Sequence, residues 1–101
     1  MTDTDGLRLR VVLAAGAALG PGKAELLEAI QETGSLTSAA RYVGMSYRRA
    51  WLLVDELNHM FDSPLIDTAK GGSGGGGHAR LSDLGIEVLT RFRRMEQAAA
   101  A

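Results

Sequence analysis

Two segments with helical periodicity follow each other between Ser35 and Phe61, separated by only three residues, Gly44-Met45-Ser46. The apolar stripe of the first segment consists of Leu36, Ala39, Ala40 and Val43, and Ser35 is a suitable N-cap for it. The apolar face of the second segment consists of Tyr47, Ala50, Trp51, Val54, Leu57 and Phe61. Trp51 and Phe61 are therefore expected to be core residues rather than stacking platforms. Two helices joined by a short turn that begins with glycine are typical of a helix-turn-helix motif, with an ordinary antiparallel helix pair as the alternative.

Further elements are predicted on both sides of this pair. Residues 7–13 alternate between apolar and polar side chains, which predicts a strand. Pro21 suits the first turn of a helix over residues 21–33, whose apolar face carries Leu26, Leu27 and Ile30, and Gly34 terminates it. After the pair, residues 64–69 and 78–81 are short and compatible with β-structure, and Ser82 begins a last helix.

The stretch between the two short strands is rich in glycine: seven of the eight residues from 71 to 78 are glycine or serine. A flexible linker would need a second domain to connect, but only about twenty residues follow, too few for a second core. A hairpin tip is the better assignment, because glycine permits positive φ and close backbone approach. The predicted fold is mainly α with a small β-hairpin. The order strand-helix-helix-helix-strand-wing-strand-helix is that of a winged helix-turn-helix domain, and the glycine-rich tip is its wing.

Length and composition narrow the class of protein. The 101 residues are predicted to form a single domain, with residues 1–6 disordered and residues 97–101 forming a frayed tail. The absence of cysteine excludes disulfides and thiolate metal sites. The longest apolar run, from Val11 to Ala18, is too short to span a bilayer, and the N-terminus is acidic, unlike a secretory signal. We therefore expect a cytoplasmic protein without membrane contact.

Catalytic chemistry finds little support. The only histidines, His59 and His78, lie on different predicted elements. No carboxylate pair, nucleophile elbow or metal-ligand spacing is present, and the glycine-rich stretch lacks the lysine and hydroxyl residue of a phosphate loop. We expect no enzymatic activity, no cofactor and no metal.

The net charge of −1 conceals an uneven distribution. No acidic residue occurs between Thr33 and Val54, a stretch that carries Arg41, Arg48 and Arg49. None occurs between Ala69 and Ser82 either, and that stretch carries Lys70, His78 and Arg80. A near-neutral chain can thus present one basic face, and double-stranded DNA is the expected partner of that face.

The candidate DNA contacts follow from these positions. Arg48 and Arg49 fall in the first turn of the second helix of the pair, where side chains reach base edges and arginine can pair bidentately with guanine. A solvated helix face is the alternative for both. Thr37 and Ser38, at the start of the first helix, offer hydroxyl and N–H groups to phosphate, whereas Tyr47 suits either a phosphate contact or packing. The predicted wing contacts are Lys70, Ser73 and His78.

A homodimer is expected because the last helix and the first strand each carry an apolar side. The last helix carries Leu84, Val88, Phe92 and Met95 on one side, and the first strand adds a second apolar face. A chain of this size does not cover both with its own core. These four residues of the last helix are the predicted dimer interface.

Most of the chain resembles the N-terminal DNA-binding domain of ModE-type, molybdate-responsive regulators. The resemblance rests on GSLTSAARYVGMSYRRAW, DELNHMF and TAKGGSGGGGHARLSDLG, and the GSLTSAA…LSDLG frame is shared more loosely with LysR-type regulators. It implies a homodimeric, sequence-specific transcriptional regulator, with Ser46, Tyr47, Arg48 and Arg49 at the head of the recognition helix. ModE-type regulators also carry C-terminal molybdate-binding domains, and this sequence ends at Ala101. We therefore expect a regulator without the sensing domain and without molybdate binding. The alternative is a protein-interaction module on a winged-helix scaffold that does not bind DNA.

Overall fold

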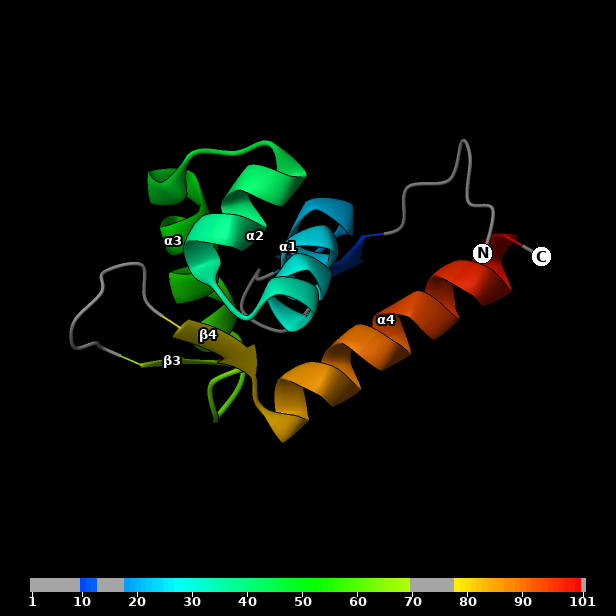
Figure 1. The fold of residues 1–101 in the computed structure, drawn as a ribbon. Coiled ribbons are helices and arrows are strands. Elements are labelled where there is room, and N and C mark those ends of the chain that lie inside the picture. The colour runs from blue at the N-terminus through cyan, green and yellow to red at the C-terminus, as the bar shows by residue number, and fades with distance from the viewer. Residues whose placement is uncertain (1–9, 13–17, 70–77, 101) are drawn as a thin grey trace.

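The computed structural model describes residues 10–12, 18–69 and 78–100. The elements are β1 (Val11–Val12), β2 (Ala18–Leu19), α1 (Pro21–Thr33), α2 (Leu36–Val43), α3 (Tyr47–Asn58), β3 (Ile66–Ala69), β4 (His78–Leu81) and α4 (Asp83–Ala100) (Figure 1). The chain is mostly helical with small antiparallel strand pairs, as a winged helix-turn-helix domain is. The predicted fold class is confirmed.

The helix ends lie where the sequence places its caps. Gly34 and Gly44 end α1 and α2 with φ values of 71° and 79°, a left-handed conformation that glycine adopts without steric cost. The Ser35 hydroxyl accepts a hydrogen bond from the Ser38 N–H at 3.2 Å, and the Ser46 hydroxyl accepts one from the Arg49 N–H at 3.1 Å. These two caps begin α2 and α3, and they satisfy backbone donors that a helix start leaves without a partner.

The core of the described residues is assembled around α1. Leu26, Leu27 and Ile30 of this helix are fully buried, as predicted, and Figure 1 shows α1 between α3 and α4. Each neighbouring element adds buried side chains to the same cluster: Leu36, Ala39 and Ala40 from α2, Ala50, Val54 and Leu57 from α3, Leu65 and Ile66 before and in β3, and Leu89 and Phe92 from α4. All the helices therefore pack on a shared apolar centre.

The hairpin of β3 and β4 is fastened to the helices at both of its described ends. Asn58, the last residue of α3, accepts hydrogen bonds from the N–H groups of Leu65 and Ile66, both at 2.9 Å. At the other strand, the Ala79 N–H donates to the Gly34 carbonyl oxygen at 3.1 Å, and His78 forms a β-bridge with Ser35. The segment between α1 and α2 therefore joins the hairpin as an additional edge, which the sequence did not indicate.

The N-terminal strand differs from its prediction. Of residues 7–13, the structure describes 10–12, and only Val11 and Val12 form a strand. This strand pairs antiparallel with Ala18–Leu19, so the region before α1 contains a hairpin rather than a single strand. The predicted disorder of residues 1–6 lies outside the described residues.

Helix α4 differs from its prediction in the residues that it buries. Its buried residues are Gly85, Leu89, Phe92 and Glu96, so its inner face lies one position further along than the apolar stripe suggested. Phe92 belongs to this inner face and is fully buried, which corrects its assignment to the dimer interface. The helix also continues through Ala100, so residues 97–100, predicted to form a frayed tail, belong to α4.

Candidate nucleic-acid interface

The first turn of α3 presents two arginines that no described residue neutralises. Arg48 and Arg49 are exposed, and the ion pairs of the described residues include neither. The Ser46 hydroxyl is committed to the Arg49 N–H, so the predicted contact residue Ser46 acts here as the cap that begins the helix. Its role is to hold the two arginines at the start of α3.

The buried side of α3 determines what its other side presents. Ala50, Val54 and Leu57 face the core, and successive residues turn by about 100° around a helix. Arg48 and Leu52, four residues apart, therefore lie opposite the core on one outward side, and Arg49 lies on its flank. Guanidinium groups on such a side are suited to the acceptor-rich edges and phosphates of a duplex.

Acidic side chains on α3 appear only in its later turns, and they have basic neighbours. The Glu56 carboxylate lies 3.3 Å from the Lys23 ammonium of α1. Asp55 lies 3.6 Å from the imidazole of His59, a contact that is ionic only when His59 is protonated. Positive charge therefore dominates the N-terminal half of α3, and the anionic half is partly compensated.

The start of α2 and the strand β4 come together. Ser38 is exposed and Thr37 half-buried at the first turn of α2, while His78 is exposed on β4 and bridges to Ser35, the N-cap of α2. Three of the predicted contact residues, Thr37, Ser38 and His78, are thus placed near one helix start. Lys70 and Ser73 lie outside the described residues.

The sequence missed the apolar exposure of α3. Trp51 is 50% exposed and Leu52 51% exposed, so the assignment of Trp51 to the core was wrong. Phe61, by contrast, packs against the core as expected, although it follows α3 rather than belonging to it. Tyr47 is half exposed, which is compatible with either of its predicted roles. The exposure of Leu52 could have been predicted from the sequence, because this residue lies one helical turn after Arg48 on the polar face.

One strand pairing weakens the basic character expected of the hairpin. Arg80 lies directly opposite Asp67 in the antiparallel register of β4 and β3, and both side chains are exposed. Opposite charges at facing positions attract each other. Arg80 therefore has an acidic neighbour that the sequence interval from Ala69 to Ser82 does not reveal, and the basic surface is centred on α3.

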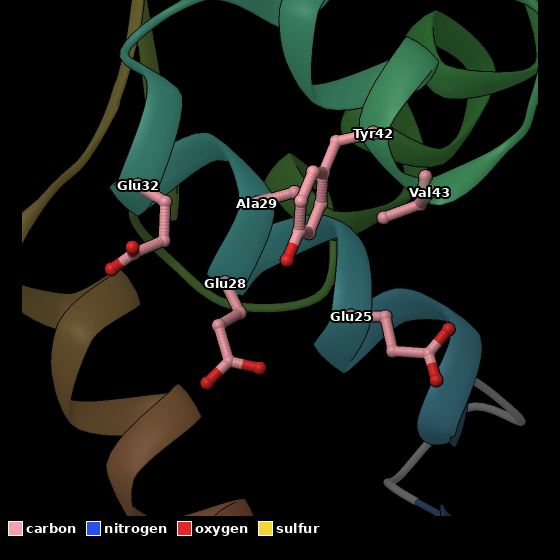
Figure 2. A pocket seen from close by; sticks show the side chains of 6 residues that line it. All are labelled: Glu25, Glu28, Ala29, Glu32, Tyr42 and Val43. Atoms are coloured by element: carbon pink, nitrogen blue, oxygen red, sulfur yellow. The ribbon is translucent and has the colours of Figure 1, made fainter.

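A hollow between α1 and α2 has the opposite charge. It has a volume of about 670 Å³ and is lined by Glu25, Glu28, Ala29, Glu32, Tyr42 and Val43. Figure 2 shows the ring of Tyr42 between the side chains of Glu28 and Glu25. Carboxylates repel phosphate, so this surface is unsuited to nucleic acid.

Two other kinds of site are absent from the described ranges. No helix there is long and apolar enough to cross a membrane. No cluster of histidine and carboxylate side chains in this part of the chain could hold a metal ion.

Comparison with known proteins adds a family and several relatives. The family model of bacterial regulatory helix-turn-helix proteins of the lysR family matches residues 22–86. The molybdenum-pterin-binding protein MopA of Rhodobacter capsulatus is 41% identical over 80 residues, which are 79% of this chain and 30% of that protein. The molybdenum transport protein ModE of Azotobacter vinelandii is 38% identical over 80% of this chain and 30% of its own length. The DNA-binding transcriptional dual regulator ModE of Escherichia coli K12 is 39% identical over 71% of this chain and 24% of its own length. The matched segment spans less than a third of each of these relatives.

Proposed function

The chain belongs to the lysR family of bacterial regulatory helix-turn-helix proteins, and we propose that it is a transcriptional regulator that binds double-stranded DNA sequence-specifically as a homodimer. The observation that carries the proposal is the pair Arg48 and Arg49, exposed at the first turn of the second helix of the motif and neutralised by no described residue. In a helix-turn-helix protein this turn enters the major groove.

The proposed contacts divide into base reading and positioning. Arg48 and Arg49 reach base edges, with bidentate hydrogen bonds to guanine as their best match. Tyr47, Thr37 and Ser38 contact phosphate oxygens, which set the register of the protein on the duplex without reading sequence. Ser46 supports them indirectly as the cap of α3.

The wing is proposed to contact the duplex beside the helix. His78 pairs with Ala69 at the end of the described hairpin that leads into the connecting segment, and Lys70 and Ser73 belong to that segment. A lysine there suits phosphate as a point charge. Lys70→Ala is expected to weaken specific and non-specific binding equally and to lower the salt slope by about one unit. Deletion of residues 74–77 is expected to have a similar effect, because it withdraws the wing and leaves α3 unchanged. If both variants bind DNA as wild type does, the stretch is a linker rather than a wing.

The proposed dimer uses an apolar stripe on the flank of α4. Leu84 and Val88 are only partly covered by the core of their own chain, and Met95 is 41% exposed. These residues recur at helical spacing on one side of α4, next to the inner face that holds Phe92. A second copy of α4 would complete their burial, and a two-fold pair of recognition helices would then face two half-sites.

Molybdate binding is not expected of this chain. The relatives with molybdenum in their names match this chain over less than a third of their length, and the family model describes the helix-turn-helix region. Calorimetry of the purified chain with molybdate is expected to show no binding, and tight stoichiometric binding would contradict this. The proposed function implies a cytoplasmic location and no catalytic activity.

The test begins with selection of bound duplexes from a random pool, followed by affinity measurements against salt. A DNA-binding regulator is expected to enrich a palindromic motif, and the logarithm of its affinity should fall linearly with the logarithm of the salt concentration. If no motif is enriched and no duplex is retained at low salt, the alternative of a protein-interaction module on this scaffold takes precedence.

A further inference from the structure

The outward side of α3 carries one apolar side chain that packing does not explain. Leu52 is 51% exposed, and its position is directly opposite the buried side of the helix. A single exposed leucine is ordinary on a protein surface. Its place is informative, because it follows Arg48 by one helical turn on the same side.

The charges of α3 limit how much of the helix can approach a duplex closely. Asp55 and Glu56 begin the third turn, and carboxylates near a phosphate backbone are repelled. The first two turns are free of acidic residues. Leu52 is the outward residue of the second turn, so it lies within the part of α3 that can enter the major groove.

The chemistry of the groove then selects the partner of Leu52. The major-groove edges of the base pairs present hydrogen-bond donors and acceptors, and thymine alone adds a methyl group. Leucine neither donates nor accepts hydrogen bonds, so it would strip water from a polar edge without replacing it. Against the thymine methyl it buries apolar surface on both sides.

We propose that Leu52 is a specificity-determining residue that contacts the C5-methyl group of one thymine in each half-site. Four residues of helix advance about 6 Å and a base pair about 3.4 Å, so this thymine lies within about two base pairs of the base that Arg48 contacts. The proposal rests on the proposed function, in which α3 enters the major groove.

A second copy of the chain is a poorer partner for this side of α3. Arg48 and Arg49 stand beside Leu52 without neutralising partners among the described residues, so two such surfaces would repel each other. Trp51 is also half exposed, but it lies on the flank of α3 rather than on the outward side. The methyl contact is therefore assigned to Leu52.

The experiment replaces single thymines by deoxyuridine in one half-site of the selected duplex. This change deletes the methyl group and leaves every hydrogen-bonding group in place. Wild type is expected to bind about fourfold more weakly at one position, the effect of one buried methyl-sized group. Leu52→Ala should bind the thymine duplex more weakly than wild type does. Replacement of that thymine by deoxyuridine should not weaken its binding any further. Leu52→Met, which keeps an apolar contact, should retain part of the methyl effect.

Ile86→Ala is the matched control, because Ile86 is a 42% exposed aliphatic residue on α4. Its affinity for the duplex should fall about fourfold when the same thymine is replaced by deoxyuridine, as that of wild type does. If wild type selects a motif but tolerates deoxyuridine at every thymine, or if Leu52→Ala keeps the methyl effect, the assignment is overturned while the proposed function stands. Failure to enrich any motif would instead reject the proposed function, and the Leu52 assignment with it.

Discussion

Helices α3 and α4 bury one side in the same core, but their exposed surfaces differ in the side chains that they present. On α3 the guanidinium groups of Arg48 and Arg49 are not neutralised by any described residue. On α4 the arginines Arg91 and Arg93 are both ion-paired, and Arg94 alone has no ion pair among the described residues. What distinguishes α4 is its apolar stripe of Leu84, Val88 and Met95, which the core of its own chain covers only in part. The difference supports the proposal that these two amphipathic helices serve different partners, a polyanion for α3 and the same apolar stripe of a second copy for α4.

The ion pairs of Arg93 show how α4 is held while its stripe stays free. Its guanidinium lies 2.8 Å from the nearly buried Glu96 carboxylate and 2.7 Å from that of Glu28 on α1. Burial lowers the pKa of Arg93, but hydrogen bonds and charge from Glu96 and Glu28 outweigh this effect, so its pKa is raised overall. Arg93 therefore stays charged throughout the pH range in which proteins are studied, and it connects α4 to α1.

The largest effect is expected at the apolar stripe of α4. Met95→Glu places a carboxylate in the proposed dimer seam and removes an apolar side chain from each copy. We expect the dimer to weaken by about 3 kcal/mol, more than a hundredfold in dissociation constant, as measured by sedimentation equilibrium. Ile86→Glu on another side of α4 is the control and should leave the dimer intact. Equal behaviour of the two variants would remove the distinction between α4 and any other surface helix.

A smaller effect is expected on the inner side of α4. Gly85 lies so close to the Leu65 carbonyl group that an added Cβ would overlap its oxygen. Gly85→Ala should lower the free energy of unfolding by about 1–3 kcal/mol, measured by urea denaturation. Gly22→Ala in α1 is the matched control, since a Cβ there meets open space, and it should stabilise by about 0.4–1 kcal/mol. Loss of stability in both variants would show that close packing at Leu65 is not the cause.

The two ion-paired arginines of α4 are expected to differ in how much they contribute to stability. Arg93→Ala leaves the nearly buried Glu96 without its partner and should cost about 1–3 kcal/mol of stability in thermal unfolding. Arg91→Ala removes the exposed pair with Glu87, at 2.7 Å, and should cost at most about 0.5 kcal/mol. If the two losses were equal, the anchoring role of Arg93 would have to be abandoned.

Sequence patterns predicted α1, α2 and α3 well because clear helix-initiating and helix-terminating residues bound them. Pro21, Gly34, Gly44 and the capping serines act locally, within a few residues of the helix ends. The same patterns misplaced Trp51, because Tyr47 and Trp51 share the edge of an apolar stripe whose centre is Ala50, Val54 and Leu57. Periodicity locates a stripe but does not say how far the core covers its edges.

The inner face of α4 could not be read from hydrophobicity. It begins with Gly85 and ends with Glu96, a residue without a side chain and a charged one, so the apolar pattern pointed to the neighbouring stripe. Gly85 faces inward because the carbonyl group of Leu65 packs directly against it, where a side chain would not fit. Glu96 faces inward because the Arg93 guanidinium neutralises its carboxylate. Both reasons are tertiary. The pairing of β1 with β2 and the bridge of His78 to Ser35 were missed for the same reason.

The central claim is that the first turn of α3 reads DNA, and the most direct test is the affinity of Arg48→Ala and Arg49→Ala for the selected duplex. Each variant is expected to lose about 1–3 kcal/mol of specific binding and to relax preference at one position of each half-site. Arg94→Ala, which removes an exposed arginine of α4, is the control and should bind within error of wild type. If Arg48→Ala and Arg49→Ala both bind the selected duplex as tightly as wild type while remaining folded, α3 is not the recognition helix and the account is contradicted.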